Sequence, residues 1–182
     1  RPGRGVRPGD GRELVPMDGA RYGDRELDHL RAGDLAACFG PGLGSRFAAL
    51  GLSRPVTLPS DPSGRMRLVH RVERLEPGGG RYGLGLIRGE ADIRPGDWFL
   101  ECHFTDDRVM PGTLMYECCL HTLRIYLLRM GWIGEDGKVS YEPVPGVSSR
   151  LKCRGQVTGA TRRVTYEITL KEIGYRPEPY AI

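Results

Sequence analysis

One stretch of the chain is apolar on almost every side of a helix. Residues 112–130, GTLMYECCLHTLRIYLLRM, place Leu, Met, Cys, Tyr and Ile at most positions of a helical repeat. A helix of this kind is stable only when the rest of the protein covers it. The sequence therefore predicts one long buried helix that begins at Gly112 and ends near Met130.

The polar residues of this helix fall on a single narrow stripe. Thr113, Glu117, His121 and Arg124 follow one another at intervals of three or four residues, so they share one face of the helix. A carboxylate among apolar neighbours costs free energy to bury unless it is paired or used. Glu117 is therefore a candidate functional residue.

Alternating apolar and polar residues elsewhere in the chain predict antiparallel strands, separated by turns such as the Pro-Gly-Gly-Gly run after Glu76. One buried helix with several such strands indicates the α+β class, in which a curved antiparallel sheet wraps around the helix. The predicted strands lie at 65–76, 81–93, 97–104, 149–157 and 164–170.

The remaining segments carry weaker signals. Residues 1–22 are rich in Pro, Gly and Arg and predict a linker or tail, so the domain is expected to span 23–182 of a longer protein. Asp24 is a candidate helix N-cap and Gly40 a helix stop. Residues 41–63 are rich in Gly, Pro and Ser and predict a surface loop.

Composition excludes several classes of protein. The five cysteines are odd in number and include no C-x-x-C pair, which favours reduced thiols in a cytoplasmic protein over disulfides or a zinc site. The net charge of +4 comes from basic residues spread along the chain, whereas nucleic-acid binding needs a denser patch. No apolar run is long enough for a membrane span.

His103 and Glu117, with Gly112 between them, suit acid–base chemistry. Burial is expected to raise the pKa of Glu117, which would make the carboxyl group a proton donor near neutral pH. His103, expected at the end of a strand, has a side chain suited to removing a proton. Gly112 would offer its amide at the helix start, where a developing oxyanion is stabilised. Together they suit the elimination of water from a β-hydroxy carbonyl compound.

Structural roles compete with each of these assignments. A histidine at a strand end is more often structural than catalytic, and Glu117 can pair with His121 or Arg124. A charged neighbour of that kind would weaken the acid role of Glu117. Cys118 and Cys119 have no activating base and are expected to pack in the core.

The segment WFLECHFTDDRVMPGTLMYE resembles the signature of the 3-hydroxyacyl-acyl carrier protein dehydratases, most closely those of the 3-hydroxydecanoyl type. That signature has a His-Phe pair, an Asp-Pro-Val-Met-Pro-Gly turn and a carboxylate on the central helix. The resemblance implies that His103 is the base, Gly112 the amide donor and Glu117 the acid. It further implies substrate contacts from Phe104, Val109, Met110, Pro111, Thr113 and His121.

The resemblance continues from about Asp24 to the end of the chain and implies a hotdog fold, a long helix wrapped by an antiparallel sheet. Two hotdogs, as a homodimer or a tandem pair, would complete each site, with the histidine from one and the carboxylate from the other. The implied activity is dehydration of (3R)-hydroxyacyl chains on an acyl carrier protein, with no cofactor. Similar MPGTLM turns occur in dehydratase modules of polyunsaturated fatty acid and polyketide synthases.

Three positions depart from the decanoyl pattern. Glu117 replaces an aspartate, Arg108 stands where the motif has proline, and Thr113 replaces a cysteine. These changes leave open the acyl chain length and any double-bond isomerisation. The last strand or two of the family are expected beyond residue 182.

Two other functions remain open from the sequence: a hotdog thioesterase or hydratase, and a non-catalytic hotdog scaffold in a multidomain synthase. An acidic carrier protein would need a basic dock. A solvated sheet face explains the same basic residues equally well. The candidates are Arg150, Lys152, Arg154, Arg162 and Arg163.

Overall fold

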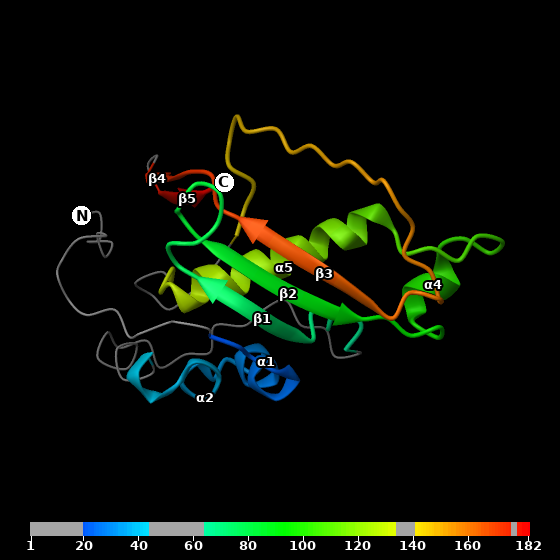
Figure 1. The fold of residues 1–182 in the computed structure, drawn as a ribbon, viewed down its shortest axis with the longest axis horizontal. Coiled ribbons are helices and arrows are strands. Elements are labelled where there is room, and N and C mark those ends of the chain that lie inside the picture. The colour runs from blue at the N-terminus through cyan, green and yellow to red at the C-terminus, as the bar shows by residue number, and fades with distance from the viewer. Residues whose placement is uncertain (1–19, 44–63, 134–140, 176–177) are drawn as a thin grey trace.

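A long helix packs against a three-stranded antiparallel sheet in the computed structural model, which describes residues 20–43, 64–133, 141–175 and 178–182. Figure 1 shows helix α5 lying across strands β1, β2 and β3, with two short helices below the sheet. The sheet order is β1-β2-β3. Its strands are Arg71–Glu76, Leu86–Asp92 and Arg163–Thr169, and the helix is Gly112–Arg129.

The ends of α5 lie where the sequence predicts them. Pro111 is the N-cap residue, with φ −57 and ψ 136, and its ring fixes a dihedral suited to a helix start. Gly131, at φ 81, follows the helix and adopts the left-handed conformation that ends many helices. The prediction of a helix from Gly112 to about Met130 is confirmed.

The central strand β2 brings the helix close to the sheet. Ile87, Gly89 and Ala91 alternate along its buried face. A Cβ atom on Gly89 would lie 2.8 Å from Oγ1 of Thr122 on α5, so only glycine allows this close approach. The predicted hairpin between 65–76 and 81–93 is confirmed as β1 and β2, with a bulge between Val72 and Arg74.

Two short helices, α1 (Asp24–Arg31) and α2 (Leu35–Phe39), cover the sheet near the start of the described chain. Gly23, rather than the predicted Asp24, is the N-cap of α1. The predicted stop at Gly40 is confirmed, at φ 94. Tyr22 is buried and exchanges two backbone hydrogen bonds with Val72, so the predicted linker does not extend to that residue.

The strand predicted over 97–104 is wrong. Residues Trp98–Cys102 form a short helix, α4, that follows a turn in which the Arg94 amide donates to the Asp97 side chain. Phe99 and Leu100 are adjacent in sequence and are both buried. Neighbouring strand residues face opposite sides of a sheet, whereas a helical turn can bury both on one side. His103 therefore follows a helix and not a strand.

The segment 149–157 forms no strand in the described chain, contrary to prediction. It runs as an extended coil between α5 and β3 in sequence, drawn yellow to orange in Figure 1. Strand β3 confirms the prediction for 164–170, and β2 is its neighbour. A separate hairpin joins β4 (Ile173–Tyr175) to β5 (Pro179–Ala181).

Buried side chains gather in two clusters at opposite ends of α5. One packs the second half of α5 against α1, α2 and β1, around Leu30, Leu75 and Leu128. The other surrounds the first half, around Leu100 and Met110. Most of the predicted loop 41–63 lies outside the described residues. Within the described part of the chain, no helix has the length and hydropathy of a membrane span.

Candidate active site

The imidazole of His103 is held by the loop that follows it. Its Nδ1 lies 3.1 Å from the carbonyl oxygen of Val109, and the Val109 amide donates to the His103 carbonyl at 2.9 Å. A carbonyl can only accept a hydrogen bond, so Nδ1 carries the proton. Nε2 is then left with a lone pair, the arrangement that a general base requires. No pattern in the sequence indicated that Val109 would be the partner.

Gly112 is the first residue of α5, so its amide has no partner inside the helix. Among the described residues it donates no hydrogen bond. A Cβ atom at this position would lie 2.8 Å from Sγ of Cys153 and 3.7 Å from Cδ2 of Leu151. The glycine therefore leaves room for the 149–157 segment to pass over the start of the helix.

The polar stripe of α5 is a cluster of three contacting side chains. Nη1 of Arg124 donates to Oε1 of Glu117 at 2.9 Å. Nε2 of His121 lies 3.1 Å from the same oxygen, at an angle that is not a hydrogen bond. Thr113, the fourth member of the stripe, is exposed. The predicted pairing of Glu117 with its helical neighbours is thus present.

Glu117 is only partly buried, and its neighbours on the helix differ in charge. Its side chain is 29% exposed, and a guanidinium contacts it directly. His121 is 3% exposed. Burial lowers the pKa of His121, against the opposing effect of Glu117, so this imidazole is neutral at neutral pH. Arg124 is the full positive charge in the cluster.

The two cysteines beside Glu117 pack as predicted. Cys118 is fully buried, and burial raises the pKa of its thiol to about 12. Burial also raises the pKa of Cys119. A thiol with a raised pKa is a poor nucleophile at neutral pH.

The residues predicted to contact substrate differ widely in exposure. Phe104 is 59% exposed, and its ring lies 3.9 Å from that of His103. Met110 is 3% exposed, and its sulfur accepts from the Tyr166 hydroxyl at 3.9 Å. The side chain of Met110 is therefore part of the core of this chain. Thr113 is exposed, His121 is buried, and Val109 and Pro111 are half-buried.

The structure does not join His103 to Glu117 within one chain. No hydrogen bond or ion pair of the described residues links them; His103 contacts its own loop, and Glu117 contacts its own helix. Gly112 lies between the two, at the junction of loop and helix. Within the described ranges, no group of His, Cys, Asp and Glu is arranged to hold a metal ion.

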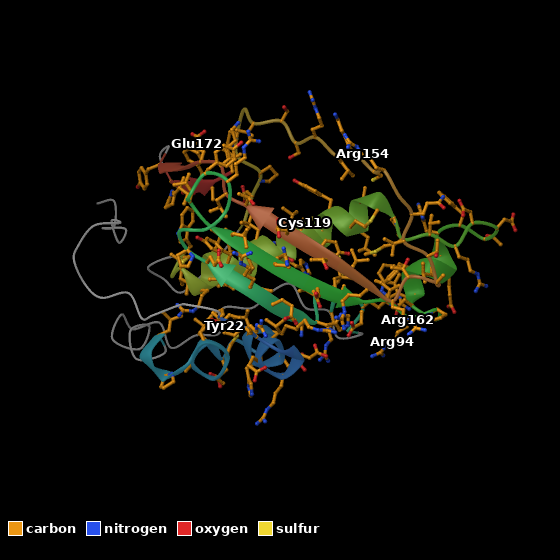
Figure 2. All side chains as sticks on the ribbon, in the orientation of Figure 1. Tyr22, Arg94, Cys119, Arg154, Arg162 and Glu172 are labelled. Carbon is orange, nitrogen blue, oxygen red and sulfur yellow. The ribbon has the colours of Figure 1, made fainter. Side chains whose placement is uncertain are left out.

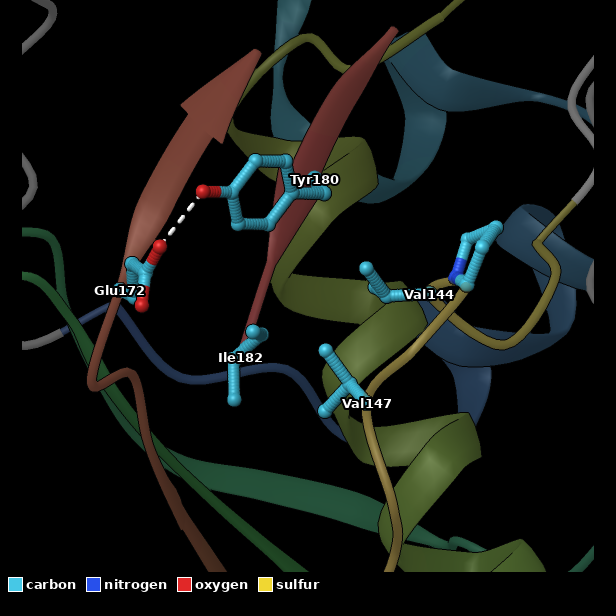
Figure 3. A pocket seen from close by; sticks show the side chains of 6 residues that line it. Val144, Val147, Glu172, Tyr180 and Ile182 are labelled. Atoms are coloured by element: carbon cyan, nitrogen blue, oxygen red, sulfur yellow. Dashed lines mark hydrogen bonds between the residues drawn. The ribbon is translucent and has the colours of Figure 1, made fainter. Parts of the chain in front are cut away.

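A cavity of about 200 Å³ lies away from these residues, beside the β4–β5 hairpin. Figure 3 shows Val144 and Val147 facing Tyr180 and Ile182, with the Tyr180 hydroxyl donating to the Glu172 carboxylate. None of the predicted site residues lines it.

Residues 61–182 match the family model of the FabA-like domain. The chain belongs to the FabA-like domain family. The arrangement of a long helix against an antiparallel sheet is the hotdog fold expected from the sequence, and that expectation is confirmed.

A curated relative is also similar to this FabA-like domain. It is one of the polyunsaturated fatty acid synthase subunits of Thraustochytrium sp., 36% identical over 120 residues. The alignment covers 65% of this chain and 8% of the relative. The chain therefore spans a small fraction of the length of the relative it matches.

Proposed function

We propose that this FabA-like domain dehydrates (3R)-hydroxyacyl thioesters carried on an acyl carrier protein, giving trans-2-enoyl thioesters and water, as part of a polyunsaturated fatty acid or related synthase. The observation that carries the proposal is the hydrogen bond from His103 Nδ1 to the Val109 carbonyl. It leaves Nε2 as a base at the loop that leads directly into α5. Family membership and the synthase relative support the same reaction.

Each residue has one step in the proposed reaction. Nε2 of His103 removes a proton from the α-carbon, and the electron pair of that C–H bond moves toward the thioester carbonyl. The amide of Gly112 donates to the carbonyl oxygen as it gains negative charge. Glu117 protonates the β-hydroxyl group as the C–O bond breaks, and water leaves. Proton exchange with solvent then returns His103 and Glu117 to their starting forms.

We place the histidine and the carboxylate of each site on two different hotdogs. Within this chain they make no contact, and each is held by its own segment. A homodimer or a tandem pair of hotdogs would bring the two together. The acyl chain would then touch Phe104 and Val109, which lie next to the base. It would also touch Pro111 and Thr113, which lie next to the amide donor.

The extended segment 149–157 offers a dock for the carrier protein. Ser149 contacts Tyr116 at 3.1 Å, and Leu151 and Cys153 approach the start of α5. Side chains alternate along an extended chain, so the residues that follow each of these three face away from the helix. These are Arg150, Lys152 and Arg154, all exposed and without an ion pair among the described residues; Figure 2 marks Arg154 on this segment.

The other basic candidates serve this dock less well. Arg163 lies 3.2 Å from Asp92 and 3.3 Å from Glu90, so its charge is already paired. Arg162 lies beyond the segment, directly before β3, and Figure 2 marks it near Arg94 at the far end of the strand. Three like charges at alternate positions complement the acidic surface of a carrier protein.

The deciding experiment measures enoyl product from a 3-hydroxyacyl-carrier-protein thioester, with wild type, His103→Ala and Glu117→Gln compared. Loss of about 10²–10⁴-fold in kcat is expected for each variant, with the circular dichroism spectrum and the melting temperature retained. Release of free acid in place of enoyl product would show a thioesterase. No turnover by a folded wild-type protein would favour the scaffold function.

A second comparison tests the dock. Replacing Arg150, Lys152 and Arg154 together by glutamine should raise KM for the carrier-linked substrate about tenfold or more. The KM for the same acyl group on N-acetylcysteamine should not change. Arg162→Gln is the matched control, and an equal effect in the control would remove the assignment to this segment.

A further inference from the structure

Only one oxygen of the Glu117 carboxylate has a polar contact among the described residues. Both of its contacts in the described chain, Nη1 of Arg124 at 2.9 Å and Nε2 of His121 at 3.1 Å, reach the same oxygen, Oε1. No hydrogen bond to Oε2 occurs among the described residues. The two oxygens of this carboxylate are therefore not equivalent.

Arg124 is itself fixed in place. Its side chain is 15% exposed, and its guanidinium carbon lies 5.8 Å from the centre of the Tyr141 ring. Tyr141 packs at the edge of the larger core cluster. A guanidinium held between an aromatic ring and a carboxylate loses little further entropy when it donates a hydrogen bond. This contact differs from a mobile surface ion pair, which contributes little.

His121 cannot replace the charge of Arg124. It is 3% exposed and its imidazole is neutral at neutral pH, because burial lowers its pKa. Among the described residues, His121 and Arg124 are the titratable or charged side chains in contact with Glu117, both from α5. Any charge that forms on Glu117 is therefore stabilised mainly by Arg124.

We infer that Arg124 is a positioning residue for the proposed dehydration: it holds Oε1 of Glu117, so that Oε2 carries the proton given to the departing hydroxyl. The inference rests on the proposed function and deepens it. In the step, the O–H bond at Oε2 breaks, the proton joins the β-hydroxyl oxygen, and the C–O bond breaks to release water. The negative charge left on Glu117 then lies against a cation that was in place beforehand.

Arg124→Gln separates this role from simple packing. Glutamine keeps a hydrogen-bond donor but removes the charge. We expect kcat to fall about 10- to 100-fold with KM nearly unchanged, because the lost interaction strengthens only as the proton leaves. A packing defect would instead lower the melting temperature and would not be rescued by an added cation.

Two further variants distinguish loss of the positive charge from misfolding. Arg124→Lys keeps the charge and should retain more activity than Arg124→Gln. Arg124→Ala should regain kcat when guanidinium ion is added at concentrations below those that change the circular dichroism spectrum. A melting temperature close to that of wild type should accompany each variant.

Turnover by wild type makes failure of this inference distinguishable from failure of the proposed function. In an active enzyme, a kcat for Arg124→Gln equal to that of wild type, or no recovery of Arg124→Ala by guanidinium ion, would overturn the role of Arg124. No turnover by folded wild type would overturn the proposed function and the positioning role of Arg124 with it.

Discussion

The two halves of α5 have different surroundings. From Thr122 to Arg129, every residue is buried except Leu123 and Arg124, under the cover of α1, α2 and β1. From Gly112 to His121, only Cys118 and His121 are buried. The two halves are equally apolar in composition but unequally covered.

One half of the helix therefore supports the stability of the fold, and the other half carries the residues of the proposed reaction. The covered half anchors the helix in the larger core cluster. The open half carries Gly112 and Glu117, with His103 in the loop just before it. The polar stripe spans the junction, with His121 as its most buried member. A covered second half thus supports the open first half, which the proposed substrate and a second hotdog would contact.

Leu128→Ala should have the largest effect on stability. Leu128 is 0% exposed in the covered half, and truncating a buried leucine costs about 2–5 kcal/mol in the free energy of unfolding. Leu114→Ala, in the open half, is the matched control and should cost less than half as much. Urea denaturation of both variants measures the two free energies. Equal losses would show that the two halves are equally packed.

Gly112→Ala should have the next largest effect, at the start of the open half. The added Cβ would meet Sγ of Cys153 at 2.8 Å, and overpacking of this kind costs about 1–3 kcal/mol. Because Cys153 is exposed, Cys153→Ala should relieve much of that cost in the double variant. A double-mutant cycle in urea tests this, and strictly additive effects would mean that the two residues do not interact.

His121 should make stability depend on pH. Burial lowers its pKa in the folded state, so below about pH 6.5 the unfolded chain binds a proton that the folded chain excludes. The free energy of unfolding should therefore fall as pH falls below about 6.5. His121→Gln should show a shallower fall in the same measurement. An identical slope would place the effect in other groups.

Tyr116→Phe should have the smallest effect. Its hydroxyl meets Oγ of Ser149 at 3.1 Å, and the tyrosine is exposed. Loss of such a hydrogen bond costs about 0.5–1 kcal/mol. Chemical denaturation should give that value, and Ser149→Ala should give nearly the same one. A cost above about 2 kcal/mol would mean that the 149–157 segment contributes more to the fold than its exposure indicates.

Local pattern was enough to predict the helix, the sheet and the polar stripe. The apolar repeat of α5 and the alternation in β1, β2 and β3 each reflect burial on one side of a regular element, which sequence records directly. The motif around Met110-Pro111-Gly112 placed Gly112 at the helix start and Glu117 on its face. These features depend on residues close together in the chain.

Local pattern gave wrong predictions where contacts with residues distant in sequence decide the secondary structure. Trp98–Cys102 alternates like a strand but forms a helix that buries Phe99 and Leu100 together. Residues 149–157 alternate as well, yet a strand also needs a partner along its length. The described chain supplies only the Met110 amide, which donates to the Val157 carbonyl at 2.8 Å beside the single bridge between Val109 and Thr158. Alternation records the two faces of a segment, but not the strand that must lie next to it.

The sequence by itself determined the boundaries of α5, the hairpin and the identities of His103, Gly112 and Glu117 as candidates. Only the tertiary structure decided which nitrogen of His103 is free and which oxygen of Glu117 is held. Those choices depend on the Val109 carbonyl and on an Arg124 side chain fixed against Tyr141. Hydrogen-bond direction and burial are properties of assembled neighbours, which residue spacing does not encode.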